Sequence, residues 1–270
     1  MKLKLQETGQ KTSLIKTSLT NKTIKDLSIQ VNLNGLSFCI FNRTSNTVEY
    51  IITIPFGDKQ TPFETLNKLK EELASNTVFS DDFNSVKVIH YNELSTLIPK
   101  ALYDEANNAE YLKFNSKILK SDFITSDEIK SKDIVSVYVP YVNINNYIFE
   151  TFGEFTYIHA STIFIDSIFN TELDTEDSLY INIESGSMQV LVTKNKDIKL
   201  YNYFEFTTPE DFIYYILFTC EQELLNPETL NIKLSGAIDK DDDLYLMVYK
   251  YIRNVSFMNN HYDFLIKNSF

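Results

Sequence analysis

The stretch LSIQVNLNGLSFCIF, residues 27–41, decides the fold that this sequence predicts. Residues 27–33 alternate between apolar and polar side chains, which is typical of a half-buried strand. Asn34 and Gly35 follow, and this pair favours a hairpin turn because both residue types tolerate positive φ. The apolar residues 36–41 predict the return strand. Residues 48–55 predict a third strand, which completes a meander.

Helix and strand signals follow the meander. Thr61, Pro62 and Glu64 form a capping-box pattern that predicts a helix start. Residues 86–91 predict the next strand. Further along, the pattern predicts a short helix within 98–112, a buried strand at 134–140, a helix at 144–152, a strand at 155–158 and a helix at 161–169.

The same order then returns. Strands are expected at 179–183, 188–192 and 198–206, a helix begins at Thr208-Pro209 and extends to about residue 224, and a strand at 230–234 precedes a helix at 244–255. The hairpin glycines Gly35 and Gly186 are 151 residues apart, and Pro62 and Pro209 are 147 apart. Such matched spacing indicates an internal duplication. The expected division is a loose N-terminal arm (1–25), a first half (26–132), its completion and a connector (133–177), and a second half (178–270).

A meander followed by a helix and a further strand is the topology of a ribonuclease-H-like unit. Two such units facing each other form the actin-like ATPase fold, with a nucleotide cleft between them. The sequence therefore predicts an α/β (α+β) protein of two ribonuclease-H-like halves in an actin-like arrangement. A generic α+β protein with coincidental hairpins is the alternative.

The chain also resembles an uncharacterised bacterial family with an actin-like ATPase fold and no assigned activity. Residues 27–42, 96–114, 207–218, 233–238 and 243–257 carry this resemblance. It implies the fold and supplies no catalytic residues. By fold alone, it also invites comparison with pilus-assembly and division proteins, which act largely through partners.

In actin-like ATPases the first hairpin of each half is a phosphate loop, commonly D-x-G-T/S. Compared with that pattern, Gln30 stands at the Asp position of the first half, and Asn182 at that of the second. Glu184 occupies a glycine position, where its charge would repel phosphate. Magnesium needs hard oxygen ligands, usually a carboxylate, and residues 27–33 contain none. The sequence therefore predicts that ATP hydrolysis is lost. The nuclease activity found in other proteins of this fold is not expected either, because it needs several carboxylates that hold two metal ions and this strand has none.

What remains is expected to be a vestigial cleft with no catalytic residue. Its candidate lining residues are Asn32, Asn182, Ser185, Gly186, Ser187, Ser235 and Gly236. Ordinary turn chemistry is the alternative explanation for these residue types. No cofactor and no metal are expected, and ATP with magnesium is the alternative.

Composition narrows the classes of partner. The formal charge is −12, which argues against a nucleic-acid partner. Basic residues cluster only at positions 2–25, and there only weakly. No apolar run is long enough to span a membrane and no secretory signal is visible, so a cytoplasmic protein is expected. Cys39 and Cys220 are expected to be buried free thiols.

Other candidate sites lack support in the sequence. His90, His159 and His261 have no zinc spacing, and His90 is expected to be a satisfied structural histidine. Ser161 is expected to cap the following helix, and residues 239–243 to form an acidic helix start. The aromatic residues between 201 and 218 are expected to be core, with an interface as the alternative.

Two functions remain open. The first is an uncharacterised, non-catalytic scaffold or protein-interaction module that binds an unidentified protein partner or itself. The alternative is a divergent ATP-binding protein or ATPase with a degenerate phosphate site.

Overall fold

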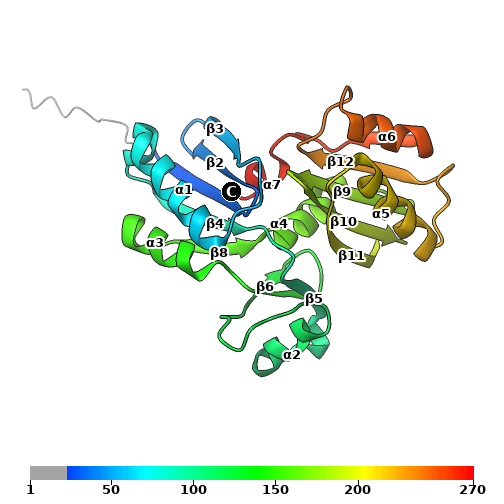
Figure 1. Cartoon of the computed structure of the whole chain (residues 1–270), viewed down its shortest axis with the longest axis horizontal. Helices are drawn as coiled ribbons and strands as arrows, with labels where there is room; N and C mark the ends of the chain where they lie inside the picture. Colours follow the sequence, from blue (N-terminus) through cyan, green and yellow to red (C-terminus); the bar gives the residue numbers. More distant parts are fainter. Residues whose placement is uncertain (1–22) are drawn as a thin grey trace, which may run out of the picture.

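The computed structural model describes residues 23–270 and places two sheet-containing halves side by side, with a small third sheet below them (Figure 1). The expected loose arm lies outside the described residues up to position 22. The first half has the strand order β3-β2-β1-β4-β8. Its elements are β1 (Lys25–Asn32), β2 (Gly35–Asn42), β3 (Thr47–Pro55), α1 (Pro62–Ser75), β4 (Ser85–His90), α3 (Val142–Phe152) and β8 (Thr156–His159).

The second half has the order β11-β10-β9-β12-β13, which repeats that of the first. Its elements are β9 (Ser178–Glu184), β10 (Ser187–Lys194), β11 (Asp197–Glu205), α5 (Pro209–Gln222), β12 (Asn231–Gly236), α6 (Asp243–Tyr251) and β13 (Asn254–Phe257). In both sheets the first three strands are antiparallel neighbours and the last two run parallel to the central strand.

Finer details of the two halves also correspond. The ladder between the second and third strands shifts register after Ile40 in one half and after Val192 in the other. Both Thr-Pro helices begin with a complete capping box, Thr61 with Glu64 and Thr208 with Asp211. The two halves therefore share a topology, the position of a β-bulge and a capping box at the start of the helix that follows the meander.

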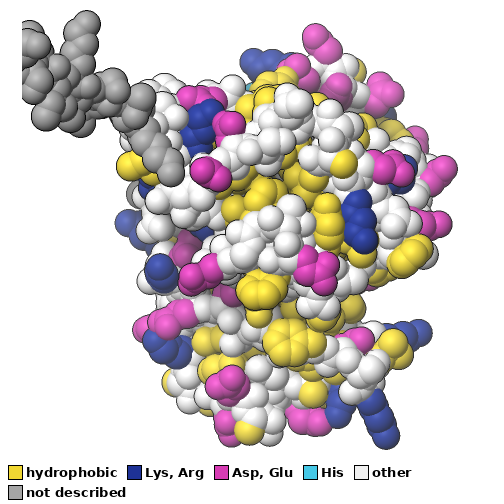
Figure 2. Space-filling model, turned by 90° about the vertical axis from the view of Figure 1, so that its left-hand side faces the viewer, with side chains coloured by type: hydrophobic (Ala, Val, Ile, Leu, Met, Phe, Trp, Pro, Cys, Tyr) yellow, Lys and Arg dark blue, Asp and Glu magenta, His cyan; other side chains and the backbone are white. Residues whose placement is uncertain are grey.

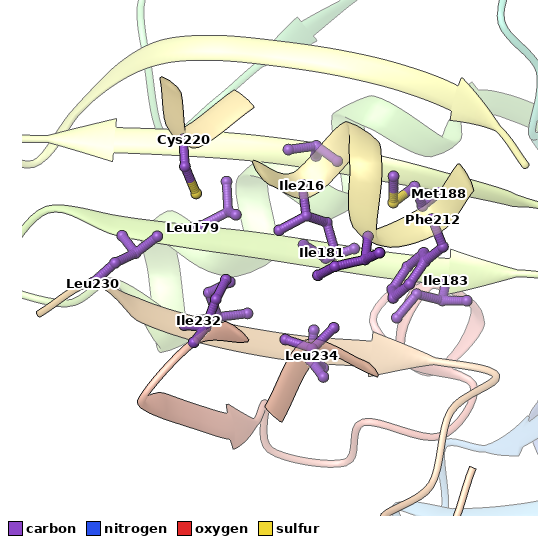
Figure 3. Close-up of a cluster of buried hydrophobic side chains, with 14 of the residues drawn as sticks. Leu179, Ile181, Ile183, Met188, Phe212, Ile216, Cys220, Leu230, Ile232 and Leu234 are labelled. Atoms are coloured by element: carbon purple, nitrogen blue, oxygen red, sulfur yellow. The ribbon is translucent and has the colours of Figure 1, made fainter. Parts of the chain in front are cut away.

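Side chains along the central strands β1 and β9 point alternately into the core of their own half and toward the other half. Leu27, Ile29 and Val31 of β1 pack in a cluster with α1 and α3. Leu179, Ile181 and Ile183 of β9 pack against α5 (Figure 3), and α6 belongs to the same cluster. The alternate residues of both strands, largely polar, consequently face the other half.

A third cluster joins the halves. It contains Ile163 and Phe164 of α4 (Ala160–Ser167) and Tyr180 of β9, together with Phe264 and Leu265 of α7 (Phe264–Lys267). Near the end of the chain, the hydroxyl groups of Ser269 and Ser28 lie 2.6 Å apart. The C-terminal segment thus packs on the first half, although it follows the second in sequence (Figure 1).

The small sheet, β5-β7-β6, is inserted between β4 and α3. It comprises β5 (Ser95–Pro99), α2 (Asn108–Lys113), β6 (Thr125–Ile129) and β7 (Ile134–Tyr138). The sequence predicts β7 and the helix but misses β5 and β6. β6 reads TSDEI with a single buried residue, and β5 ends in Pro99, so neither has a strong strand pattern. β13 was also missed, because the helix expected to reach residue 255 ends at Tyr251.

One expected cap is wrong. The N-cap of α4 is His159, whose Nδ1 accepts the backbone N–H of Ser161 at 3.1 Å. By contrast, His90 is satisfied, since its Nε2 lies 2.9 Å from Asn145 Oδ1 and its Nδ1 accepts the N–H of Tyr141. Cys39 and Cys220 are buried and unpaired, as expected.

Charged side chains of both signs are interspersed on the face that the first half presents in Figure 2. No helix within residues 23–270 has the length and apolar character needed to cross a membrane.

Candidate functional site

The candidate cleft lies where the hairpin turns of the two halves meet. Asn34, in the β1–β2 turn, donates from Nδ2 to the carbonyl oxygen of Ser185, in the β9–β10 turn, at 2.8 Å. Gly186 turns the second hairpin at φ +71°, and a side chain there would stand 3.5 Å from Asn34 Nδ2. The two positions that correspond by the internal repeat, 151 residues apart, are thus in direct contact.

A cavity of about 330 Å³ lies beside this contact. Of the residues predicted from the sequence, Asn32, Ser185 and Gly186 line it. Sequence reasoning missed much of the remaining wall. Gln30 and Glu184 belong to the two hairpin motifs and could have been found there, whereas residues such as Thr53 and Phe206 come from other elements. The other lining residues are Gln30, Asn34, Gly35, Leu36, Ser37, Thr53, Pro55, Ile183, Glu184, Phe206, Ala237 and Leu244.

The other four predicted residues do not line the cavity. Asn182 and Ser235 are fully buried on β9 and β12, where Ser235 Oγ donates to Asn182 Oδ1 at 3.0 Å. Gly236 packs against Ile183, and a Cβ there would lie 1.9 Å from the carbonyl oxygen of that residue. Ser187 is buried close to the hydroxyl groups of Tyr91 and Tyr203 and does not line the cavity, although its cross-strand neighbour Glu184 does.

Glu184 gives the cavity its electrostatic character. Burial raises the pKa of this carboxyl to about 7, although the side chains of Gln30 and Asn182 hydrogen-bond to it and act in the opposite direction. The nearby Asp263 raises it further. Among the described residues that line the cavity, Glu184 is the only one with an ionisable side chain. The cavity lining therefore has no cationic side chain to bind an anion, and Glu184 can add a negative charge that would repel one.

The cavity lacks the ligands that a magnesium nucleotide needs. Mg²⁺ takes oxygen ligands in octahedral geometry and usually one or two carboxylates. Within residues 23–270, no three His, Cys, Asp or Glu side chains gather in a way that would hold a metal ion. The cavity residues therefore do not fit a magnesium triphosphate.

A second polar cluster lies at the start of α4. The Ser161 hydroxyl is 2.7 Å from His159 Nδ1 and 2.9 Å from the Ser136 hydroxyl. Asp127 accepts the backbone N–H of His159 at 2.7 Å rather than a ring N–H. Burial lowers the pKa of His159 to about 3. Since Nδ1 accepts the Ser161 N–H and the side chains of Ser136, His159 and Ser161 are buried, the cluster caps the helix.

Comparison with solved structures identifies the fold. A Bacteroides thetaiotaomicron VPI-5482 protein with an actin-like ATPase fold and unknown function matches with a TM-score of 0.80, at 19% identity over 93% of this chain and 97% of that one. The PilM–PilN type IV pilus biogenesis complex matches at 0.54, with 12% identity over 87% and 88%. The ethanolamine utilization protein EutJ from Carboxydothermus hydrogenoformans matches at 0.52, with 6% identity over 90% and 88%.

These matches confirm the predicted actin-like fold of two ribonuclease-H-like halves. No curated protein matches the sequence. The family described as protein of unknown function (DUF3822) matches residues 15–255, nearly the whole chain. The chain is therefore a member of the DUF3822 family, with an actin-like ATPase fold and no established catalytic function.

Proposed function

We propose that this protein is a non-catalytic scaffold that acts by binding a protein partner. The observation that carries the proposal is the charge of the cleft, whose one ionisable lining residue among those described is Glu184. A triphosphate and its metal require cations, close backbone N–H groups and carboxylate ligands. The Asn34–Ser185 hydrogen bond instead joins the two hairpins directly.

The choice of a protein partner rests on charge and on the fold. A formal charge of −12 disfavours nucleic acid, which is itself polyanionic. A protein of similar fold is known in the PilM–PilN complex, so this architecture is compatible with partner binding. We further propose a cytoplasmic location, which agrees with the two unpaired cysteines.

Titration with Mg-ATP tests the proposal. A ligand that binds the native state raises stability by about 2.7 kcal/mol at a hundredfold excess over its dissociation constant. We expect no change in melting temperature at millimolar Mg-ATP and no phosphate release above that of a Gln30→Ala/Asn182→Ala control. A rise of several degrees, or phosphate release that the control lacks, would support the divergent ATPase instead.

A further inference from the structure

A large groove lies apart from the candidate cleft and is lined by β5 of the inserted sheet and by β11 of the second half, two strands that are neighbours in Figure 1. Its volume is about 900 Å³. One wall consists of residues 93–97, which include the start of β5, and the opposite wall of residues 198–203 in β11. Both are terminal strands of their sheets, with a single partner strand each within residues 23–270.

The lining shows which side of each strand borders the groove. Successive side chains of a strand point to opposite faces. A cavity that touches every residue from 198 to 203 must therefore border the edge of β11, where backbone N–H and C=O groups point. The same holds for residues 93–97.

The hydrogen-bond ladders identify the free backbone groups. The N–H of Phe206 donates to Gly186 and that of Val139 to Leu94, at the ends of the two ladders. Antiparallel ladders alternate between bonded and outward-facing residues. Counting from these bonded pairs along the observed registers gives the residues whose backbone groups point away from the partner strand and into the groove. They are Tyr201 and Tyr203 in β11 and Ser95 and Leu97 in β5.

We propose that this groove binds an extended segment of a partner protein, which adds as a strand between β5 and β11. The inference rests on the proposed scaffold function and names its binding surface. A strand of six residues, with about 3.4 Å per residue, a width of ~4.8 Å and a thickness of ~10 Å, fills roughly 1,000 Å³. This agrees with the volume of about 900 Å³. Strand addition is a recurrent mode of peptide recognition because backbone hydrogen bonds supply affinity.

The side chains that line the groove define the chemistry of the segment. Glu93 is exposed at one end of the groove. Burial raises the pKa of the Tyr203 hydroxyl, and the nearby carboxylates of Glu93 and Glu205 raise it further. Lys59 pairs with Glu205 and is also close to Glu93, so these two carboxylates and one ammonium group leave this end with a net negative charge. Lys199 is exposed further along β11, toward its start. The fitting segment therefore carries a basic residue at the Glu93 end and an acidic residue at the Lys199 end.

The test uses the full chain and ten-residue peptides selected from a random phage-displayed library. A selected peptide is synthesised and its dissociation constant is measured by fluorescence anisotropy. We expect Glu93→Lys and Lys199→Glu each to weaken binding at least tenfold. The control Glu154→Lys, an exposed change outside the groove, should leave it within twofold.

Peptide N-methylation tests the strand geometry without altering the protein. A strand between two edges uses backbone N–H groups on both sides, so methylation at either of two consecutive central positions should weaken binding at least tenfold. Tolerance at one of the two positions would overturn the proposal, as would failure to select any peptide sensitive to Glu93→Lys.

Other occupants give other results. If peptides bind only after residues 1–22 are removed, or if the Glu93→Lys change abolishes a dimer of the full chain, the groove is filled by this chain itself and the proposal is wrong. If no peptide binds in the groove and Mg-ATP has no effect, the groove proposal is wrong but the scaffold function is not, and its binding surface lies elsewhere. Mg-ATP hydrolysis overturns the scaffold function whatever the peptide result.

Discussion

Of the glycines near the candidate cleft, Gly236 has the least tolerance for a side chain. Its φ is +88°, and an added Cβ would lie 1.9 Å from the Ile183 carbonyl oxygen. Gly236→Ala is therefore expected to cost at least about 3 kcal/mol of unfolding free energy, from strain and from displaced backbone. Urea denaturation measures the loss.

Gly57 provides the matched control. Its φ is +83°, and a Cβ there would meet nothing within 4 Å. Gly57→Ala should cost only the left-handed backbone strain of about 1–2 kcal/mol. Equal losses at the two glycines would show that the contact with Ile183 contributes nothing.

Glu184 predicts a pH dependence at the same scale. Because its folded pKa of about 7 lies above its ordinary 4.5, ionisation costs stability. The stability associated with the protonated form is complete below pH 4.5 and is lost as the pH rises through 7. Glu184→Gln should thus equal the wild type near pH 4.5 and exceed it by on the order of 2 kcal/mol at pH 8.

This difference is measured by urea denaturation at several pH values. The buried histidines His90 and His159, with pKa values lowered to about 4 and about 3, lose their stabilising effect as the pH falls below 6.5. They are present in both proteins and cancel in the difference. A gap between the two proteins that stays constant from pH 4.5 to 8 would contradict the assignment to Glu184.

At the scale of single elements, α1 and α5 begin in the same way. The hydroxyl of Thr61 accepts from the backbone N–H of Glu64, and that of Thr208 from Asp211. Thr61→Ala and Thr208→Ala should each cost about 1 kcal/mol, because each leaves a helix N–H without its acceptor. The matched Thr→Ser variants, which keep the hydroxyl, should lose less, and chemical denaturation compares them. A loss in the serine variants as large as in the alanine variants would contradict the capping role.

At the scale of the whole molecule, the C-terminal helix joins the halves. Phe264 is 1% exposed and packs edge-on against Phe164 of α4, with ring centres 6.4 Å apart. Phe264→Ala should cost about 3–5 kcal/mol, since it opens a cavity in the shared core. Phe114, which is 87% exposed, is the control, and Phe114→Ala should change stability by less than about 0.5 kcal/mol. Thermal unfolding monitored by circular dichroism distinguishes them, and similar losses would contradict the role of α7.

The sequence by itself determined the two repeated halves, because hairpin turns, alternation and capping boxes act between residues close in the chain. It also showed the alternation of apolar and polar residues in β1, but the half-buried strand predicted from it is wrong, because the other half covers the polar face as well. Only the tertiary structure decided that Asn32, Ser185 and Gly186 share a cavity while Ser187 is buried beside Tyr203, because strands distant in sequence set those neighbours. The edges of β5 and β11 meet for the same reason: their groove depends on contacts between an insertion and the other half, which no local pattern encodes.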